Sequence, residues 1–334
     1  MFQLEQGILT VIGHTPLVEL RRVFGQLPFR LYAKLEACNP GGSIKDRPAI
    51  EMIRNGIQAG EIKPDTVIVE SSSGNLAIGL AQVCCCLGLR LICVVDARTN
   101  LSNIEILRAF GSEIEIVTEP DPRTGEYLPA RLDRVRSLVA EIPNSYWPNQ
   151  YANRHNPRAH FLSTMPEIVE QLGGDLDYLF CAASTCGTLA GCSDYVRQNG
   201  LRTKIIAVDA KGSVIFGDRK GPRRLPGHGA SIVPPLCDWD DMDRCIHVSD
   251  LDCVIGCRLL ARREGIMAGG SSGGVLMAVC RMREELPPCA NCVAIFPDRG
   301  ERYLETIYSD SWVTDQFGSV PEIGIARSPQ LRRA

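Results

Sequence analysis

The sequence lacks an excess of charge of either sign. Its 36 lysines and arginines nearly balance 39 aspartates and glutamates, which leaves a formal net charge of -3 over 334 residues. Such a balanced chain has no strong electrostatic attraction for nucleic acid or for an anionic membrane. We therefore expect small-molecule partners, no nucleic acid and no membrane.

Long hydrophobic runs are missing as well. The most apolar stretch, residues 81–95 (AQVCCCLGLRLICVV), is interrupted by Arg90 and is shorter than the roughly 20 residues that cross a bilayer. We interpret it as a buried helix that runs into a buried strand. The N-terminal segment MFQLEQGILTVIGHTPLVEL has no basic residues followed by an apolar run, unlike an export signal, so we expect a mature cytoplasmic protein.

Cysteine, in contrast, is abundant, and fifteen residues raise the question of disulfides or a metal site. The odd number favours reduced thiols that pack as small hydrophobic side chains. Apolar neighbours flank five of them, namely Cys84, Cys85, Cys86, Cys93 and Cys181. The CxxC pair of Cys289 and Cys292 has no second pair at zinc-knuckle spacing, so we expect no bound metal.

Short β-branched runs alternate with segments of helical period. The predicted strands are residues 66–70, 89–96, 112–119, 176–184, 203–210 and 292–298. Continuous apolar strands separated by helices are typical of parallel sheets that are covered on both faces. We predict an α/β fold with two doubly wound domains.

The predicted domains are residues 1–149, of which residues 1–12 pack on the other domain, and residues 150–313. The proline-rich, strand-poor region 120–165 is expected to form the crossing between them. Residues 217–231 (GDRKGPRRLPGHGAS) are basic and rich in glycine and proline, which indicates a surface loop or lid. Residues 314–334 are expected to form a partly disordered tail.

Three glycine- or serine-rich turns lie where helices are expected to begin. Backbone N–H groups and hydroxyls in the turn after residues 176–183 suit a phosphate, although a tight turn alone explains the glycines; its residues are Ser184, Thr185, Cys186, Gly187 and Thr188. A serine-rich turn suits a carboxylate, or simply caps a helix; it contains Ser72, Ser73, Gly74 and Asn75. Ser271, in GIMAGGSSGG (265–274), offers a neutral hydroxyl or belongs to a flexible turn.

Lys45 follows a glycine pair in the stretch NPGGSIKDRPA (39–49). A nucleotide-binding loop would place Ser or Thr after the lysine, whereas Asp46 follows here, and GxGxxG occurs at neither glycine-rich element. Taken alone, Lys45 could be a solvated charge.

Together these stretches resemble the fold-type-II pyridoxal-phosphate enzymes, the cysteine synthase and cystathionine β-synthase family. IGHTPLVEL (12–20), QYANRHNPRAHF (150–161) and FPDRGERYL (296–304) extend the resemblance along most of the chain. It implies pyridoxal 5'-phosphate as cofactor, a homodimer, and Lys45 as the Schiff-base lysine. It also implies that Asn75 faces the phenolic oxygen of the cofactor, residues 184–188 hold its phosphate, and Ser271 meets its pyridine nitrogen. The implied substrate contacts are Ser72, Ser73, Gly74 and Gln150.

The residue types suit the implied chemistry. A buried lysine sheds its proton more easily and can serve as nucleophile and base. A neutral hydroxyl opposite the pyridine nitrogen weakens the electron sink, which favours loss of a β-substituent over racemisation or transamination. The resemblance therefore implies a β-replacement, in which a second nucleophile adds to the β-carbon after the leaving group departs.

SSSGNL, PGHGAS and GGSSGG look most similar to the 2,3-diaminopropionate-pathway synthases of siderophore and peptide-antibiotic biosynthesis. Those enzymes join O-phospho-L-serine and L-glutamate into N-(2-amino-2-carboxyethyl)-L-glutamate and release phosphate. Basic residues could bind such polyanionic substrates or form a solvated surface; they are Arg47, Arg98, Arg219, Lys220, Arg223 and Arg224. His228 is left open between a site residue and a turn residue.

Two other functions stay open. One is a cysteine synthase that uses O-acetylserine or O-phosphoserine, although Leu76 stands where those enzymes usually have a threonine that contacts the substrate carboxylate. The other is a catalytically inert relative that binds a protein partner, which the intact Lys45, Asn75 and Ser271 argue against.

Overall fold

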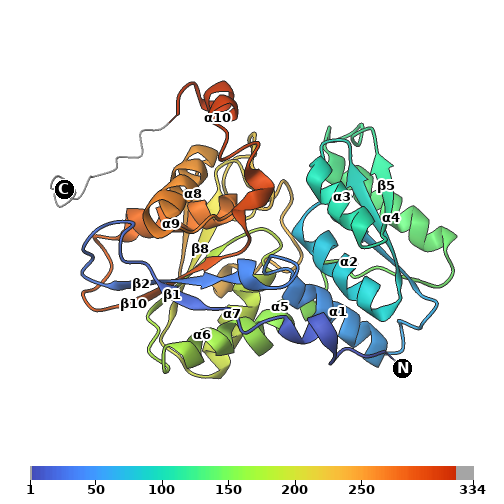
Figure 1. Cartoon of the computed structure of the whole chain (residues 1–334), viewed down its shortest axis with the longest axis horizontal. Helices are drawn as coiled ribbons and strands as arrows, with labels where there is room; N and C mark the ends of the chain where they lie inside the picture. Colours follow the sequence, from blue (N-terminus) through green and yellow to red (C-terminus); the bar gives the residue numbers. More distant parts are fainter. Residues whose placement is uncertain (1, 321–334) are drawn as a thin grey trace, which may run out of the picture.

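The computed structural model describes residues 2–320, whose strands form two sheets (Figure 1). The larger sheet has the order β1-β2-β10-β7-β8-β9, in which β1 is antiparallel to β2 and every other pair is parallel. Its strands are β1 (Leu17–Glu19), β2 (Arg30–Leu35), β10 (Asn291–Phe296), β7 (Tyr178–Ala182), β8 (Lys204–Ala210) and β9 (Arg244–Val248).

The smaller sheet is entirely parallel and has the order β5-β4-β3-β6. Its strands are β5 (Glu113–Val117), β4 (Arg90–Asp96), β3 (Val67–Ser71) and β6 (Ser145–Tyr146). The six predicted strands therefore all form. β1, β2, β6 and β9 were not predicted, because they are short or carry charged residues within an apolar pattern.

Helices connect the parallel strands. They are α1 (Asp46–Gln58), α2 (Asn75–Leu87), α3 (Leu101–Ala109), α4 (Tyr127–Glu141), α5 (His155–Ala159), α6 (Met165–Gln171), α7 (Gly187–Gln198), α8 (Asp250–Glu264), α9 (Gly270–Met282) and α10 (Asp310–Phe317). Single turns add η1 (Gly7–Val11), η2 (Glu36–Cys38), η3 (His160–Thr164, π-helical), η4 (Trp239–Asp241) and η5 (Gly300–Tyr303).

Helices cover both faces of each sheet, which confirms the predicted α/β architecture. On the larger sheet, α8 and α9 pack on one face and α6 and α7 on the other. On the smaller sheet, α1 and α2 pack on one face and α4 on the other. Alternate strand residues belong to opposite cores; for example, Ile68 packs with α2 and Val69 with α4.

The apolar stretch 81–95 forms the end of α2 and most of β4, as the sequence predicted. Gly88 ends the helix in the left-handed conformation, with φ 68°, which glycine adopts without steric cost. No helix within residues 2–320 has the length and hydropathy needed to span a bilayer.

The first 35 residues are divided between the two sheets in a way that differs from the predicted domain boundaries. Residues 17–35 belong to the larger sheet, where Ala33 of β2 pairs with Ala294 of β10. Residues 2–12 pack instead on the core formed by α1 and α2, through side chains such as Leu9. Such pairing depends on strands about 260 residues apart, which local sequence patterns do not reveal.

The predicted tail is partly helical, because α10 contains Thr314 and continues to Phe317. The Ser309 hydroxyl caps the helix by accepting from the Trp312 N–H. Residues 321–334 of the predicted tail lie outside the described residues.

Candidate active site

Lys45 lies at the N-terminal end of α1, at the carboxyl end of β10. The Ile44 N–H donates to the Pro297 carbonyl at 2.8 Å and holds the segment there. Burial lowers the pKa of Lys45 to about 8, although interactions with Cys186 and Asp298 oppose this shift. An amine with this pKa is partly neutral near neutral pH, so it can act as a nucleophile or a base.

The glycine pair before Lys45 is required by close contacts. Gly41 N–H donates to Asp46 Oδ2 at 2.5 Å, and a Cβ on Gly41 would lie 2.5 Å from Asp46 Oδ1. Gly42 has φ 85°, and its Cβ would lie 2.7 Å from Arg299 Nε. Only glycine fits these two positions, as expected for a turn that brings the backbone close to its neighbours.

Asn75 is the first residue of α2, and both ends of its amide are bound. Its Nδ2 donates to Asp298 Oδ2 at 2.8 Å, and its Oδ1 accepts from Arg302 Nη1. Tyr303 Oη donates to the same Asp298 oxygen at 2.7 Å. The amide orientation is therefore set by residues that follow β10.

The predicted phosphate turn links β7 to α7. Cys186 has φ 66°, and its buried thiol contacts Cys237; this contact and burial raise the pKa of Cys186. A Cβ on Gly187 would lie 2.2 Å from Asn156 Oδ1, so α7 begins in tight contact with α5. The first N–H groups of a helix have no partner within the helix, which leaves them available for an anion.

Side chains from the segment 155–164 support this turn. Asn156 Nδ2 donates to Thr185 Oγ1 at 3.2 Å. His160 Nε2 lies 3.3 Å from Thr188 Oγ1, and its Nδ1 lies 2.9 Å from Thr164 Oγ1. Burial, together with the positive charge of Lys45, holds the pKa of His160 well below its usual range, so the ring is neutral.

The serine-rich turn follows β3 and opens α2. Ser72 Oγ accepts from the Ala77 N–H at 3.2 Å, so it also caps the helix. Ser73 Oγ accepts from Arg131 Nη1 at 3.2 Å, and Arg131 pairs with Asp96 at 3.4 Å. Among the residues described, Arg131 Nε is buried without an acceptor. A buried donor of this kind is suited to an anionic ligand.

Gln150 is buried beside the same turn and is held through its backbone. Its N–H lies 3.4 Å from Glu70 Oε2, and its carbonyl accepts from Asn156 Nδ2 at 2.8 Å. Glu70 also accepts from Trp147 Nε1 at 3.1 Å. Burial raises the pKa of Glu70 to about 7 despite these hydrogen bonds. Gln150 therefore connects the end of β3, which precedes the serine-rich turn, to the segment that supports Thr185.

Ser271 lies in the first turn of α9 and is buried. The turn before it is fixed to β10, because the Gly269 N–H donates to the Asp298 carbonyl at 3.2 Å. The segments that contain Lys45, Asn75 and Ser271 thus all contact the chain just after β10. The turn with Cys186 joins them through its electrostatic interaction with Lys45.

Arg47, whose position after Lys45 suggested a substrate contact, is paired inside the protein instead. Its guanidinium is buried, with Nε 2.7 Å from Glu36 and Nη1 2.6 Å from Glu167. Lys34 of β2 joins the network at 2.8 Å from Glu167. The charges are compensated inside the protein, so this arginine has a structural role.

The basic residues of the predicted lid mostly have partners inside the protein. Lys220 pairs with Glu126 at 2.8 Å and connects the segment to the start of α4. Arg223 donates to the His228 carbonyl at 2.9 Å, and Arg224 donates to Gln316 at 2.8 Å. His228 itself is buried and lies 3.0 Å from the Val208 carbonyl, which makes it a core residue.

Arg98 lies outside the group of contacting segments. It is exposed, and its guanidinium lies 4.8 Å from the centre of the Tyr127 ring. This contact explains the position of the side chain without a ligand.

All fifteen cysteines lie within the described residues and are free thiols, as predicted. Cys84, Cys93 and Cys181 are buried, but the prediction was wrong for Cys85 and Cys86, which are exposed. Successive residues of a helix point about 100° apart, so only Cys84 of this run faces the sheet. Among residues 2–320, no group of three or more histidine, cysteine or acidic side chains could hold a metal ion.

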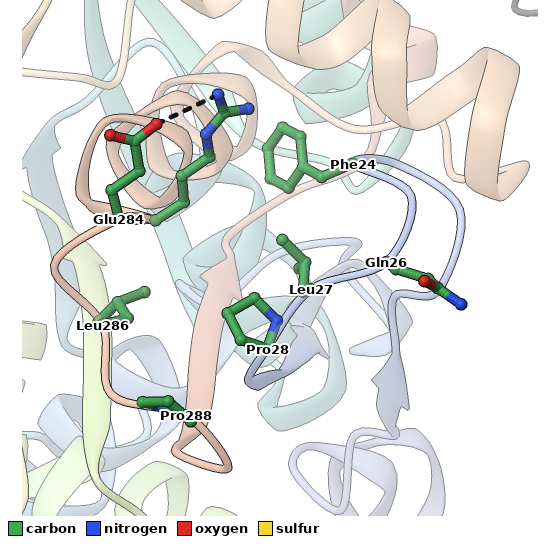
Figure 2. Close-up of a pocket in the computed structure, with 8 residues that line it drawn as sticks. Phe24, Gln26, Leu27, Pro28, Glu284, Leu286 and Pro288 are labelled. Atoms are coloured by element: carbon green, nitrogen blue, oxygen red, sulfur yellow. Dashed lines mark ion pairs between the residues drawn. The ribbon is translucent and has the colours of Figure 1, made fainter.

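The structure also has a groove of about 420 Å³, whose lining residues are drawn in Figure 2. Phe24, Leu27 and Pro28 line one side, and Leu286 and Pro288 line the other. None of the residues predicted for the site contributes to this groove.

Several residues of the site were not singled out from the sequence. Asp298 follows a buried parallel strand, a position where ligands commonly bind, and this was a usable signal. Glu70 lies at the end of β3 and offered the same signal. Arg131 is one of several arginines within α4, and nothing in its local sequence distinguishes it.

The fold and the site define a cofactor-dependent enzyme of amino-acid chemistry. A buried lysine of lowered pKa, a helix start whose N–H groups are suited to an anion, and a neutral serine on a glycine-rich turn fit pyridoxal phosphate. When bound, this cofactor supplies an aldehyde that condenses with amines and a ring that withdraws electrons from the α-carbon of an amino acid.

The chain belongs to the pyridoxal-phosphate dependent enzymes, a family that matches residues 8–298. It is 47% identical over 308 residues to N-(2-amino-2-carboxyethyl)-L-glutamate synthase of Ralstonia nicotianae, covering 92% of this chain and 91% of that protein. These matches confirm the predicted family, its fold and its cofactor, pyridoxal 5'-phosphate.

Solved structures of similar fold support the same family. The O-acetylserine dependent cystathionine beta-synthase of Helicobacter pylori superposes with a TM-score of 0.84 at 32% identity, covering 91% of this chain and 99% of that one. O-ureido-L-serine synthase gives a TM-score of 0.85 at 28% identity, covering 95% and 97%.

Proposed function

We propose that this enzyme joins O-phospho-L-serine and L-glutamate into N-(2-amino-2-carboxyethyl)-L-glutamate and releases phosphate, as a step towards 2,3-diaminopropionate. The 47% identity to a synthase of that name supports the product. The structural observation that supports a doubly charged substrate is Arg131, whose buried Nε has no acceptor among the described residues and whose Nη1 contacts the serine-rich turn. Phosphate esters are bound preferentially by arginine.

The site residues then take the following roles. Lys45 Nζ would hold the cofactor through its aldehyde and would carry the proton of the substrate α-carbon, because its lowered pKa allows both protonation states near neutral pH. The turn with Ser72, Ser73 and Gly74 binds the substrate carboxylate together with Gln150. Residues 184–188 would hold the cofactor phosphate at the start of α7.

Asn75 and Ser271 orient the ring of the cofactor. Asn75 would offer the second hydrogen of its Nδ2 to the phenolic oxygen, because the first is donated to Asp298. Ser271 would present a neutral hydroxyl to the pyridine nitrogen, so that the ring nitrogen is not held protonated.

The role of Lys45 is tested with Lys45→Ala and with Lys63→Ala, an exposed lysine, as the control. Wild type and Lys63→Ala should take up pyridoxal phosphate and show visible absorbance, whereas Lys45→Ala should not. A wild type that stays colourless would favour the inert partner-binding alternative.

The substrates are tested separately. Phosphate release from O-phosphoserine should require glutamate in stoichiometric amounts, and mass spectrometry should detect the joined product. If turnover instead requires O-acetylserine and sulfide, the cysteine synthase alternative is correct.

The proposal includes a cytoplasmic homodimer, which the family resemblance implies. Light scattering coupled to size-exclusion chromatography would give the mass of the assembly, and fractionation of cells would locate it. A monomeric mass at the working concentration would contradict the dimer.

A further inference from the structure

Asp298 contacts three of the segments that form the site. It is 2% exposed and directly follows Pro297 at the end of β10. Its Oδ2 accepts from Asn75 at 2.8 Å, its carbonyl accepts from Gly269 at 3.2 Å, and its backbone bridges to Ser43. The residue thus joins the Lys45 segment, the start of α2 and the turn before Ser271.

The second carboxylate oxygen is kept free. Asp298 Oδ1 is buried and accepts no hydrogen bond within residues 2–320. A Cβ on Gly269 would lie 2.0 Å from this oxygen, so the glycine leaves room for it. A buried carboxylate oxygen without a donor is costly, and such atoms are concentrated at functional sites.

Three titratable groups interact with Lys45, namely Asp298, Cys186 and His160. Asp298 and Cys186 both raise the pKa of Lys45 against the effect of burial. His160, on the turn between α5 and α6, is held neutral and adds no charge. Burial raises the pKa of Asp298 itself, while hydrogen bonds from Asn75 and Tyr303 and the positive charges of Arg302 and Lys45 oppose this shift and favour the carboxylate. Within this group Asp298 is the carboxylate that interacts with the lysine.

We propose that Asp298 is a positioning residue of the reaction, which fixes the Asn75 amide with one oxygen and provides the counter-charge for the Lys45 ammonium with its carboxylate. The inference rests on the proposed role of Lys45. It adds a specific function: Asp298 sets the fraction of Lys45 that is neutral at a given pH.

The proposal predicts a shift in the titration of Lys45 when the charge is removed. Asp298→Asn keeps the shape of the side chain and an oxygen that can accept from Asn75 and Tyr303, but it removes the negative charge. With Lys45 titrating near pH 8, a fall of about one unit would raise its neutral fraction at pH 7 about fivefold. The difference in neutral fraction between wild type and Asp298→Asn should vanish above about pH 9, where the Lys45 amine is neutral in both proteins.

The experiment measures the reactivity of Lys45 in the full-length protein after removal of the cofactor, with circular dichroism to verify the fold. Lysines are acetylated with trace acetic anhydride across the pH range, and the modification of Lys45 is quantified by mass spectrometry relative to exposed Lys63. Asp298→Asn should be labelled about fivefold faster at pH 7. Tyr303→Phe, which removes a hydrogen bond to the same oxygen but keeps the charge, should not be labelled faster than wild type.

A second readout uses the protein loaded with pyridoxal phosphate. The pH dependence of the visible absorbance should shift in Asp298→Asn and in Asp298→Ser, and should stay unchanged in Tyr303→Phe. A purely structural role would lower the unfolding temperature of both Asp298 variants without moving either titration, and that result would overturn the proposal.

These readouts separate the inference from the proposed function. If Lys45→Ala still bound the cofactor with wild-type absorbance, the role of Lys45 would be wrong, whereas the labelling profile would still report its charge partner. If Asp298→Asn is labelled like wild type while the Lys45→Ala protein is colourless, the role of Asp298 is wrong and the role of Lys45 stands.

Discussion

Asn75 and Asp298 are 223 residues apart in the chain, yet Asn75 Nδ2 donates to Asp298 Oδ2 at 2.8 Å. Asn75 begins α2, which follows β3 of the smaller sheet, and Asp298 follows β10 of the larger sheet. The bond therefore crosses between the two parts of the molecule at the place where the predicted cofactor contacts converge. Placement of these groups depends on both sheets, so a change in either one should alter the site.

Replacement of Arg131 should weaken substrate binding. The loss of a hydrogen bond to a charged group costs about 1.5–3 kcal/mol, so Arg131→Ala should raise the KM for O-phosphoserine about 10- to 100-fold. Arg131→Lys should recover part of the loss, because it keeps the charge but not the planar donors. Steady-state kinetics checks both, with exposed Arg136→Ala of the same helix as the control. Equal KM values for the two alanine variants would contradict the assignment.

Glu70 should destabilise the protein above neutral pH. Its pKa is raised from 4.5 to about 7 by burial, so between these values the native state holds a proton that the unfolded state has lost. Native stability therefore falls as the pH rises through this window, by up to about 3 kcal/mol. Glu70→Gln mimics the protonated acid and should unfold at a higher temperature than wild type at pH 8.

At pH 4.5 the two proteins should unfold at similar temperatures, because Glu70 is then protonated in the native state. Trp147 donates to Glu70, so its fluorescence should follow the same titration in wild type and lose it in Glu70→Gln. Glu115→Gln, on the more exposed strand β5, is the control. A stability difference that does not depend on pH would contradict the prediction.

Arg47→Ala should destabilise the fold strongly. The substitution leaves the buried Glu36 carboxylate without its main counter-charge and removes one of the two ion pairs of Glu167. Breaking a buried ion pair by removing one partner costs about 3–5 kcal/mol. Arg54→Ala, on the same helix and more exposed, should cost about 1 kcal/mol or less. Urea unfolding monitored by circular dichroism measures both, and similar midpoints would show that the network contributes little.

Gly41→Ala should impair cofactor binding. The new Cβ would lie 2.5 Å from Asp46 Oδ1, so the turn before Lys45 or the carboxylate that binds it must shift. We expect the affinity for pyridoxal phosphate to fall about tenfold or more, which corresponds to about 1.4 kcal/mol. Gly125→Ala introduces a side chain at φ 69° in open space and should lower stability without changing this affinity. Fluorescence titration with the cofactor compares the two variants.

Local patterns predicted much of this molecule. Strands such as β3 and β4 are continuous apolar runs, and the turns after them contain the glycines and hydroxyls that begin helices. The chemistry of Lys45 was also predictable, because its neighbours match a family motif over several separate segments. These features depend on short stretches of chain, where side-chain type and backbone preference act together.

Local sequence patterns could not predict other features of the molecule. Lys34 lies in a strand that contains two basic residues. Its burial is explained by three acceptors in other segments of the chain, namely the Thr15 carbonyl at 2.7 Å, Glu167 at 2.8 Å and Gln171 at 2.9 Å. From the sequence, Arg47 could bind substrate, whereas in the structure Glu36 and Glu167 compensate its charge. Residues 2–12 were expected to pack on the C-terminal domain and residues 17–35 to belong to the N-terminal one, but the structure has the opposite arrangement. For residues 17–35 the reason is that β2 pairs with β10 of the larger sheet.

The sequence by itself determined the strand-turn-helix units and the types of side chain that each turn presents, since both follow from hydrophobic period and from local backbone preference. The tertiary structure alone decided which of these groups meet. Asp298 acquires its role only because β10 ends beside the start of α2 and the turn of α9, and such contacts arise from packing two sheets rather than from any one segment.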